Sequence, residues 1–131
     1  MVKCKVLALL LCEKATRDPD GKVALHGLFD RIIMPRTRLD VDIFFLYYKI
    51  VVVEPCTVAL RVVHLNQSES EIPGHWRDSF SELGPVQSIW ALSTDLFKQP
   101  GEYALKLMLA MEGPETFELA STLMTVDQGG E

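Results

Sequence analysis

Residues 41–53 read Val-Asp-Ile-Phe-Phe-Leu-Tyr-Tyr-Lys-Ile-Val-Val-Val, and this stretch decides the fold class. β-branched and aromatic side chains dominate it, and such side chains suit a pleated strand better than a helix. Successive strand residues point to opposite sides, yet both sides are apolar here from residue 43 onward, interrupted only by Lys49. The stretch therefore predicts a strand that is apolar on both of its faces.

Further strand patterns lie on both sides of this stretch, separated by turn sequences. The apolar residues 3–15 run into the tight-turn sequence Asp18-Pro19-Asp20-Gly21, and residues 23–34 return from it as the second strand of a hairpin. Gly27 inside that second strand predicts a bulge or a bend. Four more strands are predicted at residues 57–65, 86–92, 102–111 and 116–126.

Seven or eight strands with regular turn signals predict an all-β, antiparallel two-sheet sandwich. It would contain at most one or two short helical turns, the first of them capped by Ser93 or Thr94. In the last strand we expect Phe117, Leu119 and Leu123 to face the core. Residues 66–74 are polar and predict a loop, and residues 127–131 predict a frayed tail.

The composition indicates one domain spanning residues 1–131. The chain is 48% hydrophobic, which is enough to fill a single core. The net charge of −5 disfavours nucleic acid and anionic membranes as partners, because both attract basic surfaces. The apolar run at residues 6–11 is too short for a secretion signal or a membrane span, so we expect a cytoplasmic protein without membrane contact.

The three cysteines predict free thiols. Their odd number and low density argue against the disulfide scaffold of a small secreted protein. Cys4 and Cys12 are expected on one strand, roughly 27 Å apart at a rise of about 3.4 Å per residue, too far to be bridged. We expect buried, reduced cysteines, and no close Cys or His pair indicates a zinc site.

No residue pattern indicates a catalytic, cofactor or metal site. His26, His64 and His75 are isolated in the sequence and lie in no metal-binding motif. Residues 75–79, His-Trp-Arg-Asp-Ser, contain the residue types of a hydrolase triad, but adjacent residues rarely converge on one reacting atom. We therefore expect no enzymatic activity.

The same short stretch is a candidate binding loop. Trp76 and Arg77 are residue types that often anchor protein interfaces. In the competing interpretation, Trp76 and Phe80 plug one end of the sandwich and take no part in recognition.

Residues 92–103, Leu-Ser-Thr-Asp-Leu-Phe-Lys-Gln-Pro-Gly-Glu-Tyr, resemble the corner between the fifth and sixth strands of immunoglobulin-like sandwiches. There a short helical turn precedes a Gly and a Tyr, and the resemblance implies that the Tyr103 hydroxyl bonds to nearby backbone. Leu105 stands where a cysteine would be, so the usual inter-sheet disulfide of that class is not expected.

The chain, over residues 3–126, also resembles a family of uncharacterised bacterial β-sandwich proteins. Their shared elements are a Leu-Leu-Leu-Cys first strand, an Asp-x-Asp-Gly-Lys turn, a Gly-Leu/Ile-Phe-Asp second strand followed by Pro, and a Pro-Gly-x-Tyr strand opening. These elements stand at residues 9–12, 18–22, 25–30, Pro35 and 100–103. The resemblance implies the sandwich fold and transfers no catalytic residue.

The apolar second face of residues 41–53 is the main functional signal. In a two-sheet sandwich one side of each strand meets the core and the other meets water, so a monomer would expose this face. We therefore expect a subunit interface, most simply a two-fold homodimer. Its residues would be Ile43, Phe45, Tyr47, Val51 and Val53. A terminal segment or residues 66–85 folding over that face is the competing interpretation.

The leading functional hypothesis is a non-enzymatic module that binds protein, including a second copy of itself, without a cofactor. The alternative is a small-molecule or carbohydrate-binding sandwich with an aromatic-lined site between or beside the sheets. The side chains that would line such a site are Tyr47, Tyr48, Trp76 and Trp90.

Overall fold

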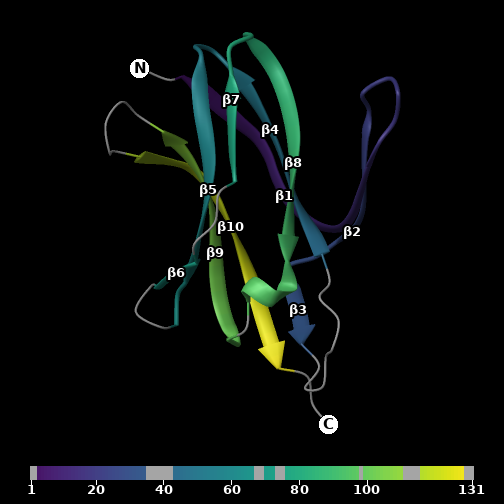
Figure 1. The fold of residues 1–131 in the computed structure, drawn as a ribbon, viewed down its shortest axis with the longest axis vertical. Coiled ribbons are helices and arrows are strands. Elements are labelled where there is room, and N and C mark those ends of the chain that lie inside the picture. The colour runs from purple at the N-terminus through teal and green to yellow at the C-terminus, as the bar shows by residue number, and fades with distance from the viewer. Residues whose placement is uncertain are drawn as a thin grey trace.

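Two β-sheets lie face to face in the computed structural model of this chain (Figure 1). The structure describes residues 3–34, 43–66, 70–72, 76–97, 99–110 and 116–128. In these ranges nearly all regular structure is strand, so the predicted all-β, two-sheet sandwich is confirmed. No helix in the described ranges is long and apolar enough to cross a membrane.

The first sheet, sheet A, has four strands in the order β2–β1–β4–β8. Their bounds are Cys4–Arg17 for β1, Val23–Leu28 for β2, Ile43–Val52 for β4 and Gly84–Ser93 for β8. The predicted strand at residues 41–53 is β4, and it pairs along its length with β1 on one side and β8 on the other. The most apolar strand thus occupies a central position, where both of its edges are hydrogen-bonded.

The second sheet, sheet B, has six strands along the path β3–β10–β9–β5–β6, with β7 also paired to β5. Their bounds are Arg31–Met34 for β3, Cys56–His64 for β5, Ser70–Ile72 for β6, Arg77–Phe80 for β7, Gly101–Ala110 for β9 and Thr116–Gln128 for β10. Among the described strands only β3 and β10 pair in parallel. Three of the ten have four residues or fewer, so seven longer strands build the sandwich, as predicted.

The core lies between the two sheets and forms one continuous cluster. Alternate residues of the central strands point into it: Phe44, Leu46, Tyr48 and Ile50 from β4, Trp90 and Leu92 from β8, and Tyr103, Leu105, Leu107 and Leu109 from β9. Burying an apolar side chain of this size stabilises the fold by about 1.5–3 kcal/mol. The strand predicted at residues 102–111 is β9, and its odd-numbered side chains face the core.

The corner before β9 forms as its sequence predicts. The Ser93 hydroxyl accepts the Asp95 amide at 3.2 Å and caps the 3-10 turn η1 (Thr94–Leu96). The Tyr103 hydroxyl donates to the Gln99 carbonyl at 2.6 Å, which is the backbone tie that the resemblance implied. Burial raises the pKa of this phenol, so it stays protonated and keeps the bond.

Residues 23–34 are not one strand, and that prediction was wrong. The first half is β2 in sheet A, and the second half is β3 in sheet B. Gly27 has a φ of +69°, a left-handed conformation in which the chain bends, as its position predicted. By Asp30 the chain has reached the other sheet, where its carbonyl accepts the Thr125 amide at 2.8 Å.

The last strand, β10, extends further than predicted. Asp127, expected in the frayed tail, pairs with β3 and accepts a hydrogen bond from Arg31. Residues 129–131 lie outside the described part of the chain, as does Pro35. A short strand, β6, also lies within residues 66–74, which were predicted as loop.

The inward side of β10 was predicted wrongly in its second half. Leu119 packs against the core as predicted, and Phe117 lies opposite the core residue Leu109 but is exposed near the start of the strand. Leu123 is 57% exposed, whereas Met124 is buried. The register with β9 shifts between Glu118 and Ala120. One extra residue at such a bulge reverses the side that all later side chains face, so the even-numbered residues point inward after it.

Candidate functional site

The outer face of sheet A, the side turned away from the core, follows from the strand register. Residues directly opposite one another in antiparallel strands point to the same side. Three rows cross β1, β4 and β8 on this side: Ala8–Lys49–Gln87, Leu10–Tyr47–Ile89 and Cys12–Phe45–Ala91. Apart from Lys49 and Gln87 these side chains are apolar, so the apolar face extends across three strands and not only along β4.

The predicted interface residues lie on this outer face and differ in exposure. Ile43 and Val53, at the two ends of the segment, are exposed. Phe45 and Val51 are partly buried, and Tyr47 is only 8% exposed. The middle of the outer face is therefore covered by another part of the same chain.

The tip of the β1–β2 hairpin provides a cover. Gln87 on β8 accepts a hydrogen bond from the Tyr47 hydroxyl at 2.7 Å, and its amide nitrogen donates to the Gly21 carbonyl at 3.1 Å. In Figure 1 this hairpin leaves sheet A and curves back along its right-hand side. We call this Tyr47–Gln87–Gly21 chain of contacts the hairpin clasp. The hairpin, and not residues 66–85, makes this contact.

Asp18 gives the hairpin tip its shape. Its side-chain oxygen accepts the amides of Asp20 at 3.1 Å and Lys22 at 2.9 Å, and its carbonyl accepts the Gly21 amide at 3.0 Å. This is the turn that the Asp-Pro-Asp-Gly sequence predicts. It orients the Gly21 carbonyl so that Gln87 can reach it.

Exposed apolar side chains remain around the clasp. Of the nine large apolar side chains exposed among the described residues, five belong to the outer face of sheet A or its rim. They are Leu7, Leu10, Leu28, Ile43 and Val53. The outer face therefore gathers more exposed apolar surface than any other part of the described molecule.

The candidate binding loop is divided between core and surface. The Trp76 indole packs against the core, and its N–H donates to the Ala91 carbonyl of β8 at 3.1 Å. This contact agrees with the interpretation of Trp76 as a plug. Arg77 is exposed on β7 and remains available to a partner.

The four aromatic side chains of the alternative hypothesis do not gather around one cavity. Tyr48 and Trp90 contact each other in the core, with ring centroids 4.7 Å apart. Tyr47 points to the opposite side of β4, toward the hairpin clasp. A ligand site in this protein would therefore have to use other residues.

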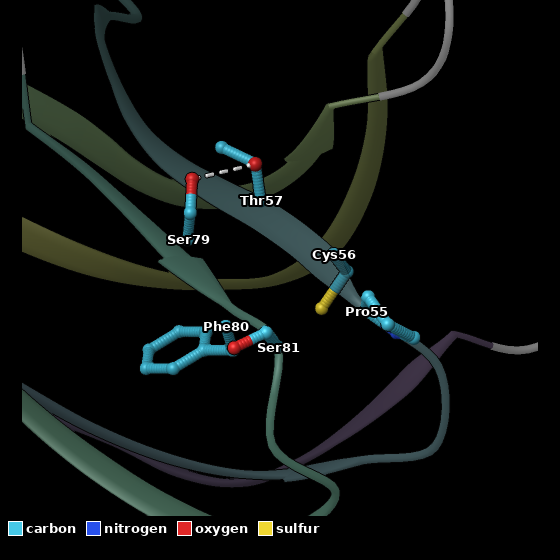
Figure 2. A pocket seen from close by; sticks show the side chains of 6 residues that line it. All are labelled: Pro55, Cys56, Thr57, Ser79, Phe80 and Ser81. Atoms are coloured by element: carbon cyan, nitrogen blue, oxygen red, sulfur yellow. Dashed lines mark hydrogen bonds between the residues drawn. The ribbon is translucent and has the colours of Figure 1, made fainter.

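A hollow of about 360 Å³ opens where the end of β7 runs beside the start of β5 (Figure 2). It is lined by Pro55, Cys56, Thr57, Ser79, Phe80 and Ser81. Thr57 and Ser79 share a hydrogen bond of 2.8 Å on one side of the strands, while the Cys56 sulfur and the Phe80 ring lie on the other side. Sequence reasoning missed this hollow, because it arises from the pairing of two strands.

A buried polar network ties the two sheets together near this hollow. The Asp78 carboxylate of β7 accepts hydrogen bonds from the Tyr48 hydroxyl and, at 2.9 Å, from the Ser88 hydroxyl, both in sheet A. Burial and, secondarily, the neighbouring Asp78 raise the pKa of Tyr48, so its hydroxyl remains a donor. These polar groups are used internally. Among the described residues no three metal-ligating side chains cluster together.

The three cysteines are free and buried, as predicted. Sequence reasoning correctly separated Cys4 from Cys12, because Cys4 lies opposite Val52 and Cys12 opposite Phe45. It missed that Cys4 lies next to Cys56. The signal was the short turn at residues 53–55, which brings the start of β5 back beside the end of β4 that Cys4 pairs with.

The described geometry defines a two-sheet β-sandwich with an apolar outer sheet face that is partly covered by its own hairpin. The chain is similar to a solved structure described as "Crystal structure of the C-terminal domain of wzt". The TM-score is 0.60 at 11% sequence identity, and the alignment covers 99% of this chain and 77% of that one. At this identity the similarity supports the fold alone. No family model and no curated protein match the sequence.

Proposed function

We propose that this protein is a non-enzymatic binding module that forms a two-fold homodimer through the outer face of sheet A. The observation that carries this proposal is the group of exposed apolar side chains on that face and its rim. They surround the middle of the face, which the hairpin covers, and exposed apolar side chains gathered on one face commonly serve association.

A second copy is the occupant that suits the shape of this face. Sheets pack on one another through flat faces, so the outer face of one copy is complementary to the same face of another. Leu7 and Leu10 lie on β1, and Ile43 lies at one end of β4, so the exposed groups are spread widely enough to be buried together. The clasped hairpin, which covers the middle of this face, would then lie within the interface and contribute part of its contact surface.

The absence of catalysis and a cytoplasmic location are parts of the same proposal. The Asp78 carboxylate and the Tyr48 hydroxyl, which lie near the hollow, are engaged with each other, and the Thr57 and Ser79 hydroxyls that line it are hydrogen-bonded to each other. The three cysteines are free thiols, which suits a reducing compartment. The net charge of −5 supports a protein partner over nucleic acid or an anionic membrane.

The solution mass tests the homodimer. Light scattering on the 14.7 kDa chain is expected to give twice that mass at concentrations on the order of tens of micromolar. Leu10→Lys places a charge in the interface and is expected to weaken dimerisation by about 100-fold or more. Leu123→Lys, on the exposed side of β10, is the matched control and should leave the dimer unchanged.

Circular dichroism of both variants confirms that each still folds. A wild-type chain that remains monomeric at these concentrations contradicts the proposal. Dissociation caused by Leu123→Lys, with Leu10→Lys still dimeric, would place the interface on sheet B instead.

A small-molecule or carbohydrate ligand is the second candidate, and the hollow beside β7 favours it. The Ser81 hydroxyl stands there beside the Phe80 ring, and a polar group next to an aromatic ring suits a sugar. Titration with neutral mono- and disaccharides is expected to shift NMR amide signals at the start of β5 and the end of β7. Ser81→Tyr, which fills the hollow, should abolish these shifts, whereas Ser121→Tyr on β10 should not. No shift up to about 10 mM sugar would rule out this candidate.

A further inference from the structure

Two cysteines from different sheets meet where the chain passes from sheet A to sheet B. Cys4 of β1 lies opposite Val52, the last residue of β4. The carbonyl next to it, that of Lys3, accepts the amides of Val53 at 2.8 Å and Glu54 at 3.0 Å. These bonds hold the turn against β1, and β5 then begins at Cys56 directly after it. The backbone thus places the two cysteines side by side.

The two side chains point into the same part of the core. Both belong to the core cluster, with Cys4 3% and Cys56 9% exposed, and burial first and then the neighbouring Cys56 raise the pKa of the Cys4 thiol. A disulfide, with its sulfur–sulfur bond of about 2.05 Å, needs both side chains to project into one space, and the common position of Cys4 and Cys56 in the core meets that condition. Cys12 has no part in this pair, because Phe45 and Val52, the residues opposite Cys12 and Cys4, lie roughly 24 Å apart along β4.

Cys56 is the more exposed member of the pair. Cys56 lines the hollow between β5 and β7, and Figure 2 shows its sulfur among the lining side chains. Cys4 does not line the hollow, and its pKa is raised to about 11 by burial first and then by the charge and the hydrogen bond of Cys56. The geometry therefore orders the two thiols, with Cys56 as the first to react and Cys4 as the second.

We propose that Cys4 and Cys56 form a reversible disulfide between the two sheets by exchange with a low-molecular-weight disulfide that enters the hollow beside β7. This modification site is independent of the proposed homodimer. It differs from the disulfide of immunoglobulin domains in its position. The proposed bond joins β1 to the start of β5 near the β4–β5 turn and does not involve β9, the strand that contains Leu105.

The exchange takes place in two balanced steps. The Cys56 thiolate attacks one sulfur of the small disulfide, forms a mixed disulfide and releases one small thiolate. The Cys4 thiolate then attacks the Cys56 sulfur, forms the inter-sheet bond and releases the second small thiolate. The two protons of the cysteines pass to the two released thiolates, so one small disulfide is reduced to two thiols while the protein pair is oxidised.

The bond would keep residues 4 and 56 joined in the unfolded chain as well. Such a crosslink restricts the denatured ensemble, so oxidation is expected to raise the melting temperature by about 10 °C. The formation rate should increase with pH from 7 to 9, because both attacking groups must be thiolates and the high pKa of Cys4 leaves little thiolate at neutral pH.

Oxidised glutathione, followed by peptide mapping without reduction, tests the proposal on the native chain. The expected product has lost two hydrogens and contributes one free thiol to alkylation after denaturation, that of Cys12. Trypsin cuts after Lys3, Lys5, Lys14, Lys49 and Arg61, so each cysteine falls in its own peptide. The expected linked pair is the dipeptide 4–5 joined to peptide 50–61, with peptide 6–14 free.

Three variants separate the roles of the cysteines. Cys12→Ala should form the same linked pair at the same rate as the wild-type chain. Cys4→Ser should stop at the mixed disulfide, with glutathione on Cys56, and Cys56→Ser should react much more slowly, because Cys4 does not line the hollow. The peptide map of the wild-type chain identifies the linked cysteines without any variant. It therefore decides the result even if one of the variants fails to fold. Linkage of Cys12, linkage only between chains, or three free thiols after days of oxidation would overturn the proposal.

Discussion

Gly101→Ala is expected to destabilise the fold by at least about 3 kcal/mol. Gly101 begins β9 with a φ of +138°, a conformation that residues with a side chain rarely adopt. A Cβ atom there would lie 2.6 Å from Nε2 of His64 and 2.5 Å from Oδ1 of Asn66. Both distances are well inside van der Waals contact, so the neighbours would have to move.

Neither neighbour can move without losing a contact that supports the corner. His64 is buried, stacks on Tyr103 with ring centroids 4.5 Å apart and lies 3.2 Å from the Pro100 carbonyl. The Asn66 side chain accepts the amide of Glu102 at 2.5 Å. The added methyl group therefore disturbs the opening of β9 from two sides.

Urea unfolding measures the effect, with Gly84→Ala as the matched control. Gly84 also has a positive φ, +112°, but a Cβ atom there meets nothing within 4 Å. The control isolates the backbone strain and is expected to cost about 1–3 kcal/mol, less than Gly101→Ala. If the two variants lose the same stability, the close approach of His64 and Asn66 contributes nothing and the explanation is wrong.

Asp78→Ala is the second substitution with a large expected effect, a loss of about 3 kcal/mol. It removes the acceptor shared by the Tyr48 and Ser88 hydroxyls, both of which belong to sheet A. The Tyr48 ring is fully buried between its aromatic neighbours, so its hydroxyl cannot turn to water. A buried donor without a partner costs more than the hydrogen bond contributed.

A double-mutant cycle with Tyr48→Phe separates this bond from general packing. Tyr48→Phe alone is expected to cost about 1–2 kcal/mol. The loss of stability in the double variant should be smaller than the sum of the two single losses by about 1 kcal/mol or more. Ser79→Ala, on the same strand as Asp78, breaks an exposed hydrogen bond to Thr57 of β5 and should change stability by less than about 0.5 kcal/mol. If the two losses of stability are additive, the Asp78 carboxylate stabilises the fold through contacts other than the Tyr48 hydroxyl.

Sequence reasoning succeeded where a long run of β-branched, aromatic or alternating apolar residues decides the result. Residues 41–53 and 102–111 became β4 and β9, the central strands, and the Tyr103 corner formed as its sequence predicted. It failed where one residue changes the phase or the partner of a strand. The bulge after Glu118 reversed the inward side of β10, and the bend at Asp30, after the end of β2, sent β3 to the other sheet.

The candidate sites show the same division. The apolar second face of β4 was predicted, and the register extends it across β1 and β8. The hairpin clasp was not predictable, because Gly21 and Gln87 are 66 residues apart and meet only through the curvature of the hairpin. The neighbouring positions of Cys4 and Cys56 depend in the same way on how one turn is hydrogen-bonded to β1.

The sequence by itself determined the all-β class, the central strand and the excess of apolar surface on sheet A. The physical reason is that a period of two residues and β-branched side chains act locally, within one strand. Only the tertiary structure decided which apolar side chains stay exposed, which thiols meet and where the hollow opens. These features depend on the register between strands and on the path of the turns, where a change of one residue alters every later contact.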